Sequence, residues 1–237
     1  DVMDVASKLL QVVNRRALMA KYLLAFEKKN TMKYLSHLDL LRLFKRAFRS
    51  AEVNLLFSEG FNPHPRMAFG QPLSLGYESL EEWLEIETQN ELNLDFVQEK
   101  MNQYLPQGIQ ITGIKKQNSW SKSIASTCQQ AHYQIILPIG PCSLDTDNLL
   151  HSFLAQKEIL VEKSSKKHKE IQIVNIKPMI RFVTLSREDD FLIMNADLDA
   201  GSQSNLSPEL LIQGFLRFSQ LQIPRHQIKV LRTKLIF

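Results

Sequence analysis

The sequence predicts an α+β fold made of two ferredoxin-like halves, each with the element order β-α-β-β-α-β and an antiparallel sheet. Three observations support this prediction. Short apolar runs alternate with segments that repeat apolar residues at helical spacing, the order of elements recurs after the middle of the chain, and a polar, serine-rich linker at 118–130 separates the two copies. The halves share element order but no matching residues, so duplication is a hypothesis, and one α+β domain with an irregular antiparallel sheet is the alternative.

The first half, residues 19–117, contains six predicted elements. The strands are short and either apolar throughout or alternating, whereas the helices repeat apolar residues every three or four positions. In chain order we expect a strand at 21–29, a helix at 36–52, strands at 53–57 and 83–88, a helix at 93–105 and a strand at 109–116. Residues 1–18 precede this order, and we expect them to form a helical extension outside the fold.

The second half, residues 131–237, repeats the same order by the same criteria. We expect a strand at 132–139, a helix at 146–156, strands at 158–163 and 191–199, a helix at 207–220 and a strand at 228–237. The segment 164–185 fits no element of the repeat. We expect it to be a basic insertion, either a hairpin that leads into a strand or a short helix.

Composition limits the classes of function. The chain has 237 residues, is 44% hydrophobic and carries a formal net charge of +4, which suits an acidic partner such as nucleic acid without requiring one. Its two cysteines, Cys128 and Cys142, form no CxxC pattern, so we expect no metal site and no cofactor. No apolar run is long enough to span a membrane and no secretory signal is present, so we expect a cytoplasmic protein without a membrane partner.

The helix at 36–52 begins with Ser36-His37-Leu38-Asp39, a hydroxyl, an imidazole and a carboxylate within four residues. Ser36 and Asp39 fit an S-x-x-D capping box, which explains them by helix-start chemistry and not by catalysis. His37 has no place in that box. It is either an idle exposed residue or a group that faces a ligand attracted by the positive end of the helix.

The same helix has a basic face, because four cationic residues recur at i, i+3, i+4 and i+7. They are Arg42, Lys45, Arg46 and Arg49. An amphipathic helix needs some polar face, but no acid follows Asp39 until Glu52, so we expect this face to lack neutralising i,i+4 partners. We therefore expect it to bind the phosphates of a nucleic acid.

The stretch SEGFNPHPR, residues 58–66, predicts a stiff loop. Its two prolines fix backbone angles and restrict the residues before them, and its glycine permits a left-handed turn. A stiff corner is one interpretation. We favour a recognition loop, because polar groups on rigid loops commonly build a site. Phe61 could stack on a base or lie in the core, and we expect the core. The polar residues that would contact a ligand are Glu59, Asn62, His64 and Arg66.

Two further sets of residues are candidates for a site. His37, Glu59 and His64 are catalytic candidates if the two imidazoles converge on one substrate position, but they have no fixed spacing such as HExxH that would predict a metal site. A basic tract in the insertion is either a solvated loop or an extension of a positive surface for RNA that also includes residues of the last strand. This set comprises Lys166, Lys167 and Lys169, with Lys229, Arg232 and Lys234.

Several motifs of the chain carry a resemblance to a known family. The strongest are SHLD (36–39), RLFKRAFR (42–49), SEGFNPHPR (58–66) and PLSLGYES (72–79), and weaker ones are NIKPMI (175–180), SPELLIQGF (207–215) and VLRTKL (230–235). With these motifs the chain resembles a bacterial radical-SAM-associated family of unknown function. Members occur beside or fused behind a radical SAM protein, so the resemblance implies a radical SAM partner and an accessory role. The chain has no three-cysteine cluster motif, so we do not expect it to generate the radical itself.

These observations together predict an accessory protein without catalytic activity that presents an RNA or ribonucleoprotein substrate to a radical SAM enzyme. One alternative is an RNA-modifying or RNA-cleaving enzyme that uses His37 and His64 as acid and base. The other is a protein-only adaptor, which would expose apolar surface and bind its partner with little dependence on salt.

Overall fold

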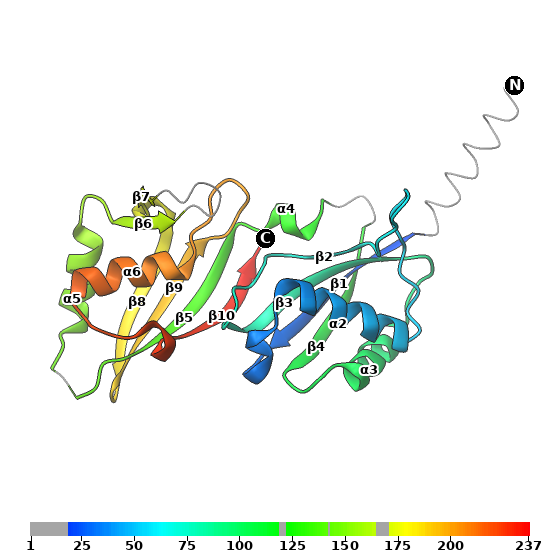
Figure 1. Cartoon of the computed structure of the whole chain (residues 1–237), viewed down its shortest axis with the longest axis horizontal. Helices are drawn as coiled ribbons and strands as arrows, with labels where there is room; N and C mark the ends of the chain where they lie inside the picture. The colour runs from blue at the N-terminus through cyan, green and yellow to red at the C-terminus, as the bar shows by residue number, and fades with distance from the viewer. Residues whose placement is uncertain (1–18, 119–121, 142, 165–170) are drawn as a thin grey trace, which may run out of the picture. The chain divides into compact units, whose positions relative to one another are not determined.

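The computed structural model describes residues 19–118, 122–141, 143–164 and 171–237 (Figure 1). The fold is α+β, and within the described ranges it contains a mixed eight-stranded sheet, a separate two-stranded sheet and five α-helices. The chain forms two compact units. Unit 1 comprises the residues up to 75 together with 81–126, and unit 2 comprises 76–80 together with 127–237. The predicted helical extension at 1–18 lies outside the described residues.

Unit 1 follows the predicted order of elements, with a short 3-10 helix added after the first strand. Its elements are β1 (Ala20–Lys28), η1 (Asn30–Tyr34), α2 (His37–Ser50), β2 (Met67–Phe69), β3 (Glu78–Thr88), α3 (Leu94–Tyr104), β4 (Ile109–Gln117) and α4 (Ile124–Thr127). The strands lie in the order β4-β1-β3, and β2 pairs antiparallel with β3. The first three residues of β3 belong to unit 2.

The core of unit 1 fixes the orientation of α2. Phe44 and Phe48 of this helix are buried, and the Phe44 ring packs edge-on against Phe26 of β1 at 4.9 Å between ring centroids. Each such buried aromatic side chain contributes roughly 1.5–3 kcal/mol to stability. Figure 1 shows α2 lying across the strands of unit 1. Because the apolar face of α2 is buried, its basic face points to solvent.

Unit 2 contains a second set of strands and helices. They are β5 (Gln130–Pro138), α5 (Thr146–Ala155), β6 (Leu160–Ser164), β7 (Ile171–Asn175), η2 (Lys177–Met179), β8 (Ile180–Glu188), β9 (Phe191–Asp199), α6 (Pro208–Ser219), η3 (Arg225–Gln227) and β10 (Lys229–Ile236). The order β10-β5-β9-β8 is antiparallel throughout. β10 also runs parallel to the start of β3, which makes the sheet mixed and corrects the prediction of purely antiparallel sheets.

The predicted strand at 53–57 is wrong. This segment forms only isolated bridges, Leu55 with Thr88 and Phe57 with Pro65, and the second strand of the sheet is β2 instead. The reason lies in its backbone hydrogen bonds. The N–H of Leu56 donates to the carbonyl of Glu87 at 2.8 Å, and its carbonyl accepts from the N–H of Arg66, at the end of the loop, at 2.7 Å. The apolar run therefore forms the base of the loop and not a continuous strand.

The predicted strand at 158–163 exists as β6, but it does not join the main sheet. It pairs with β7 in the two-stranded sheet, and β8 takes the position beside β9. β6 instead packs under α6, where a Cβ built on Gly214 would lie 3.1 Å from the Val161 side chain. The insertion 164–185 therefore contributes the second strand of a hairpin, a 3-10 turn and part of β8. No described helix is long and apolar enough to cross a membrane.

Candidate functional site

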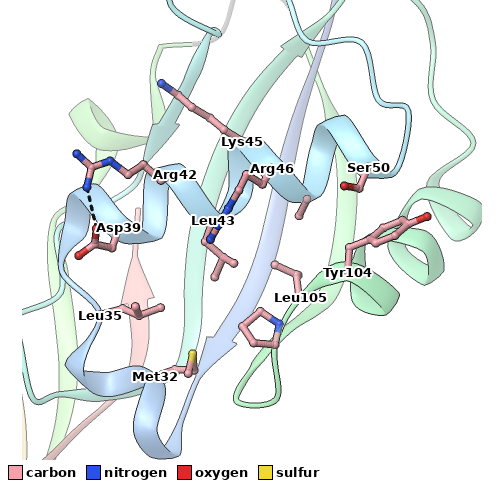
Figure 2. Close-up of a pocket in the computed structure, with 12 residues that line it drawn as sticks. Met32, Leu35, Asp39, Arg42, Leu43, Lys45, Arg46, Ser50, Tyr104 and Leu105 are labelled. Atoms are coloured by element: carbon pink, nitrogen blue, oxygen red, sulfur yellow. Dashed lines mark hydrogen bonds and ion pairs between the residues drawn. The ribbon is translucent and has the colours of Figure 1, made fainter.

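An open groove of about 980 Å³ runs along α2 in unit 1 (Figure 2). Its walls come from three segments that are distant in the sequence. These segments are η1 with the residue that follows it, the exposed side of α2, and the end of α3 with the turn after it. The lining residues are Met32, Leu35, Asp39, Arg42, Leu43, Lys45, Arg46, Ala47, Ser50, Tyr104, Leu105 and Pro106.

The start of α2 contains the predicted cap and one ion pair. Ser36 is the N-cap, its hydroxyl oxygen accepts from the backbone N–H of Asp39 at 3.2 Å, and its hydroxyl donates to the Asp39 carboxylate at 2.7 Å. Arg42 Nη1 lies 2.9 Å from Asp39 Oδ1. The hydrogen bond from Ser36, and then the one from Arg42, hold the pKa of Asp39 below its usual range. The basic face is therefore partly neutralised by an i,i+3 pair with Asp39, a spacing that the expectation of no i,i+4 partners did not consider.

The remaining cations of the basic face are exposed and uncompensated. Within the part of the chain that the structure describes, Lys45, Arg46 and Arg49 form no ion pair. Lys45 and Arg46 line the groove, whereas Arg49 lies one turn further along α2 and does not. Figure 2 shows the Arg46 side chain running from α2 toward Leu43, while Lys45 points away from the apolar residues.

The floor of the groove is apolar. It is formed by Leu43 of α2, by Met32 of η1 with Leu35 just after it, and by the two residues after α3, Leu105 and Pro106. At the end of α3, Tyr104 keeps 47% of its surface exposed. The groove thus combines positive charge, apolar surface and one accessible aromatic ring. Sequence reasoning found the cations and missed the floor, because no spacing rule links segments about 70 residues apart.

The loop 58–66 is closed at its base by hydrogen bonds. The backbone N–H of Ser58 donates to the carbonyl of His64 at 2.8 Å, and the N–H of His64 donates back to the Ser58 hydroxyl at 2.9 Å. Arg66 forms an ion pair with Glu87 at 2.9 Å, so this guanidinium is already compensated. Gly60 has φ +119, a backbone angle that other residues adopt only with strain.

The tip of the loop exposes an aromatic ring. Phe61 is fully exposed and Phe57 is 55% exposed, so the expectation that Phe61 fills the core is wrong. The prolines and the reciprocal Ser58–His64 bonds turn the chain outward before the ring can reach the core. Glu59, Asn62 and His64 are also exposed.

The two candidate catalytic histidines lie in different surroundings. His37 packs edge-on against Phe69 at 5.3 Å between ring centroids and lines a small cavity with the buried residues Lys28 and Glu82. His64 sits on the exposed loop. Among the described residues no contact joins the two imidazoles, so this geometry lends no support to acid–base catalysis at a shared position.

The other predicted basic residues differ in their exposure. Lys166, Lys167 and Lys169 lie outside the described residues. Arg232 is buried at 2% exposure and is not part of a positive surface, whereas Lys229 and Lys234 are exposed. Over the described ranges, no group of three or more histidine, cysteine, aspartate or glutamate side chains is placed to hold a metal ion.

Three of the solved structures that the chain resembles are remote in sequence and in fold. A chain of the "Crystal Structure of a Cbf5-Nop10-Gar1 Complex" has a TM-score of 0.47 and 7% identity, and the match covers 94% of this chain and 50% of that one. An unknown protein from Galdieria sulphuraria has a TM-score of 0.24 and 11% identity, covering 92% and 97%. A putative glycine cleavage system transcriptional repressor has a TM-score of 0.24 and 9% identity, covering 92% and 98%.

The present chain thus spans half the length of the Cbf5-Nop10-Gar1 chain that it matches. No curated protein matches the sequence. The sequence matches a family model, because residues 21–208 match the family described as "Uncharacterized protein conserved in bacteria (DUF2344)". The match covers well over half of the chain, and the protein belongs to the DUF2344 family of bacterial proteins.

Proposed function

We propose that unit 1 binds RNA at the groove along α2, and that the protein recognises an RNA or ribonucleoprotein substrate for a radical SAM enzyme. The observation that carries the RNA part is the set of uncompensated cations, Lys45, Arg46 and Arg49, on one exposed helix face beside an open groove. The radical SAM partner enters the proposal through the resemblance of the SHLD and SEGFNPHPR motifs.

Phosphate is the ligand that best fits these cations. Lysine and arginine side chains that neutralise phosphates release counterions, and this release supplies most of the affinity of a sequence-independent nucleic-acid contact. Arg46 offers a planar fork of N–H donors that matches a phosphate. Because Arg42 is already paired with Asp39, we assign phosphate binding chiefly to Lys45 and Arg46, with Arg49 extending the surface beyond the groove.

The loop 58–66 has the opposite character and receives a different role. It carries the acidic Glu59 and no free cation within the described residues, since Arg66 is paired with Glu87. An exposed aromatic ring on a loop held at its base resembles the anchors that dominate protein–protein contacts. We therefore propose that Phe61 contacts the partner protein and not the phosphates of the RNA.

A protein-only adaptor is the second candidate function. The full exposure of Phe61 and the partial exposure of Phe57 favour it, because such surface fits a protein contact without any nucleic acid. Only the salt dependence of RNA binding separates the two candidates, since an adaptor has no need for the cations along α2.

The experiment measures binding of labelled total cellular RNA across a salt series, for the natural chain and for Lys45→Gln/Arg46→Gln. We expect the plot of log K against log salt to become shallower by about 1.4 in the variant, about 0.7 for each lost contact. The control, Lys122→Gln/Lys157→Gln, removes the same charge at exposed positions outside the groove and should behave as the natural chain. Absence of salt-sensitive binding by the natural chain would overturn the proposal and leave the adaptor.

We also propose that the two units are ferredoxin-like halves related by duplication. The order β1-α2-β2-β3-α3-β4 of unit 1 supports this idea. In unit 2, β8 lies beside β9 at the edge of the sheet, as β2 lies beside β3 in unit 1. An experimental structure in which β8 does not border β9 would contradict it.

A further inference from the structure

The groove presents two kinds of surface, one positively charged and one apolar. A patch that only binds phosphate needs the positive charge alone. Arg46 and Lys45 bring positive charge from α2, whereas Leu35, Leu43 and Leu105 provide a predominantly apolar floor. Leaving that floor in contact with water costs free energy that a ligand recovers only by covering it. The best ligand is therefore anionic on one side and apolar on the other.

Tyr104 gives the apolar side a specific geometry. It is the last residue of α3, keeps 47% of its surface exposed and lines the groove. The end of its helix is anchored, because the Asn102 side chain donates to the carbonyl of Ile111 at 3.0 Å and accepts from its N–H at 2.7 Å. Leu105, the next residue, is buried and donates to Met101. The ring is thus presented from a fixed scaffold beside Leu105 (Figure 2).

A single-stranded RNA segment has the required chemistry. Its phosphates are anionic and its bases can leave the stack and lie against an aromatic side chain. A duplex offers phosphates and sugars while its bases stay inside, so the floor and the Tyr104 ring would remain uncovered. We infer that the groove selects a single-stranded segment with one base stacked on Tyr104. This inference rests on the proposed function, since it names the form of RNA that the same groove binds.

An acidic amphipathic peptide is the competing occupant, because it too is anionic and apolar. The observations favour RNA on two counts. The cations beside the floor include the guanidinium of Arg46, which can stack on bases as well as bind phosphate. The exposed aromatic ring of Tyr104 offers a π-face that every base can use, whereas aliphatic peptide side chains would need only the floor.

The test compares two labelled RNA probes, a uridine single strand of about 12 nucleotides and a duplex of similar length, a size within the range of one single-strand site. We expect the natural chain to prefer the single strand. Tyr104→Ala should weaken single-strand binding about fivefold or more while leaving duplex binding unchanged. Tyr104→Phe keeps the ring and should bind as the natural chain does. Tyr34→Ala, which removes another exposed tyrosine of unit 1, 66% accessible, that does not line the groove, is the control.

The outcomes separate this inference from the proposed function. Equal binding of both probes, or an unchanged single-strand affinity in Tyr104→Ala, overturns this inference. The proposed function survives that result if Lys45→Gln/Arg46→Gln still loses salt-dependent binding. Failure of the natural chain to bind either probe overturns both. Binding of an acidic amphipathic helical peptide that is lost in Tyr104→Ala, with no RNA binding, assigns the groove to a protein instead. A melting temperature for each variant shows that a loss of binding is not a loss of folding.

Discussion

Asp39 neutralises one of the cations of the groove, so its removal should improve RNA binding. Its carboxylate lies 2.9 Å from Arg42 Nη1 and accepts from the Ser36 hydroxyl. Asp39→Asn keeps the size of the side chain and an oxygen that accepts from Ser36, and it removes only the negative charge. Both members of the ion pair are largely exposed, with 71% of the Arg42 side chain and 49% of the Asp39 side chain accessible, so Arg42 can turn to a phosphate without further rearrangement.

The expected gain corresponds to one additional phosphate contact. The plot of log K against log salt should become steeper by about 0.7, and at about 0.1 M salt the affinity for a single strand should rise roughly fivefold. Stability should change in the opposite direction. Asp39 lies in the first turn of α2, where a negative charge interacts favourably with the helix dipole, so the melting temperature of the variant should fall slightly.

The assay is a salt series with the single-stranded probe, combined with a thermal melt. The matched control is Asp95→Asn, which removes an exposed acid from the first turn of α3 but does not line the groove. We expect a similarly lower melting temperature for the control and an unchanged RNA affinity. Equal affinities of Asp39→Asn and Asp95→Asn would refute the reasoning, because the charge of the groove would then have no bearing on binding.

Two further predictions concern stability. Gly108→Ala should lower the free energy of unfolding by about 2 kcal/mol or more, because Gly108 has φ +96 and a Cβ there would lie 2.6 Å from the carbonyl oxygen of Lys29. In denaturant titrations the control Gly60→Ala, at a position with positive φ but open space around it, should lower the free energy of unfolding by less. Equal losses in the two variants would contradict the steric argument. Burial opposes ionisation of Glu209, but hydrogen bonds from Arg225 and Tyr77 outweigh it and hold the pKa of Glu209 below its ordinary value of 4.5. The stability that this carboxylate contributes is complete above about pH 4.5 and is lost as the pH falls through the lower folded-state pKa. Glu209→Gln should therefore lower the free energy of unfolding at pH 7 and reduce the further loss of stability on acidification. An identical loss of stability on acidification in the natural chain and the variant would count against this prediction.

The predicted elements of unit 1 were largely confirmed because local signals set them. The capping pattern of Ser36 fixed the start of α2, and the spacing of Phe44 and Phe48 fixed its buried face. The strand predicted at 53–57 failed because an apolar run does not reveal where its backbone hydrogen bonds go. Pairing of β6 with β7 instead of the main sheet likewise depends on partners that the sequence does not specify.

The parts of the candidate site that lie close together in the sequence were predictable, and the parts contributed by distant segments were not. Helical spacing placed Arg42, Lys45 and Arg46 on one face, and the i,i+3 relation of Asp39 to Arg42 was a signal that could have revealed their ion pair. Tyr104 was not predictable, since it reaches the groove through the packing of α3 beside α2. The exposure of Phe61 was not predictable, because the apolar character of a side chain does not distinguish a core residue from an exposed anchor.

Strand β3 gives the chain an unusual connectivity. Glu78 and Ser79 pair with β10 in unit 2, and the Ser79 hydroxyl donates to the Arg232 carbonyl at 3.2 Å. A fragment that begins at residue 127 would therefore lack a strand segment that belongs to its own unit, and the exposed backbone groups of β10 would form an edge prone to intermolecular pairing. The boundary between the units is not a single point in the chain, so no one cut or deletion can remove the first unit and leave the second whole.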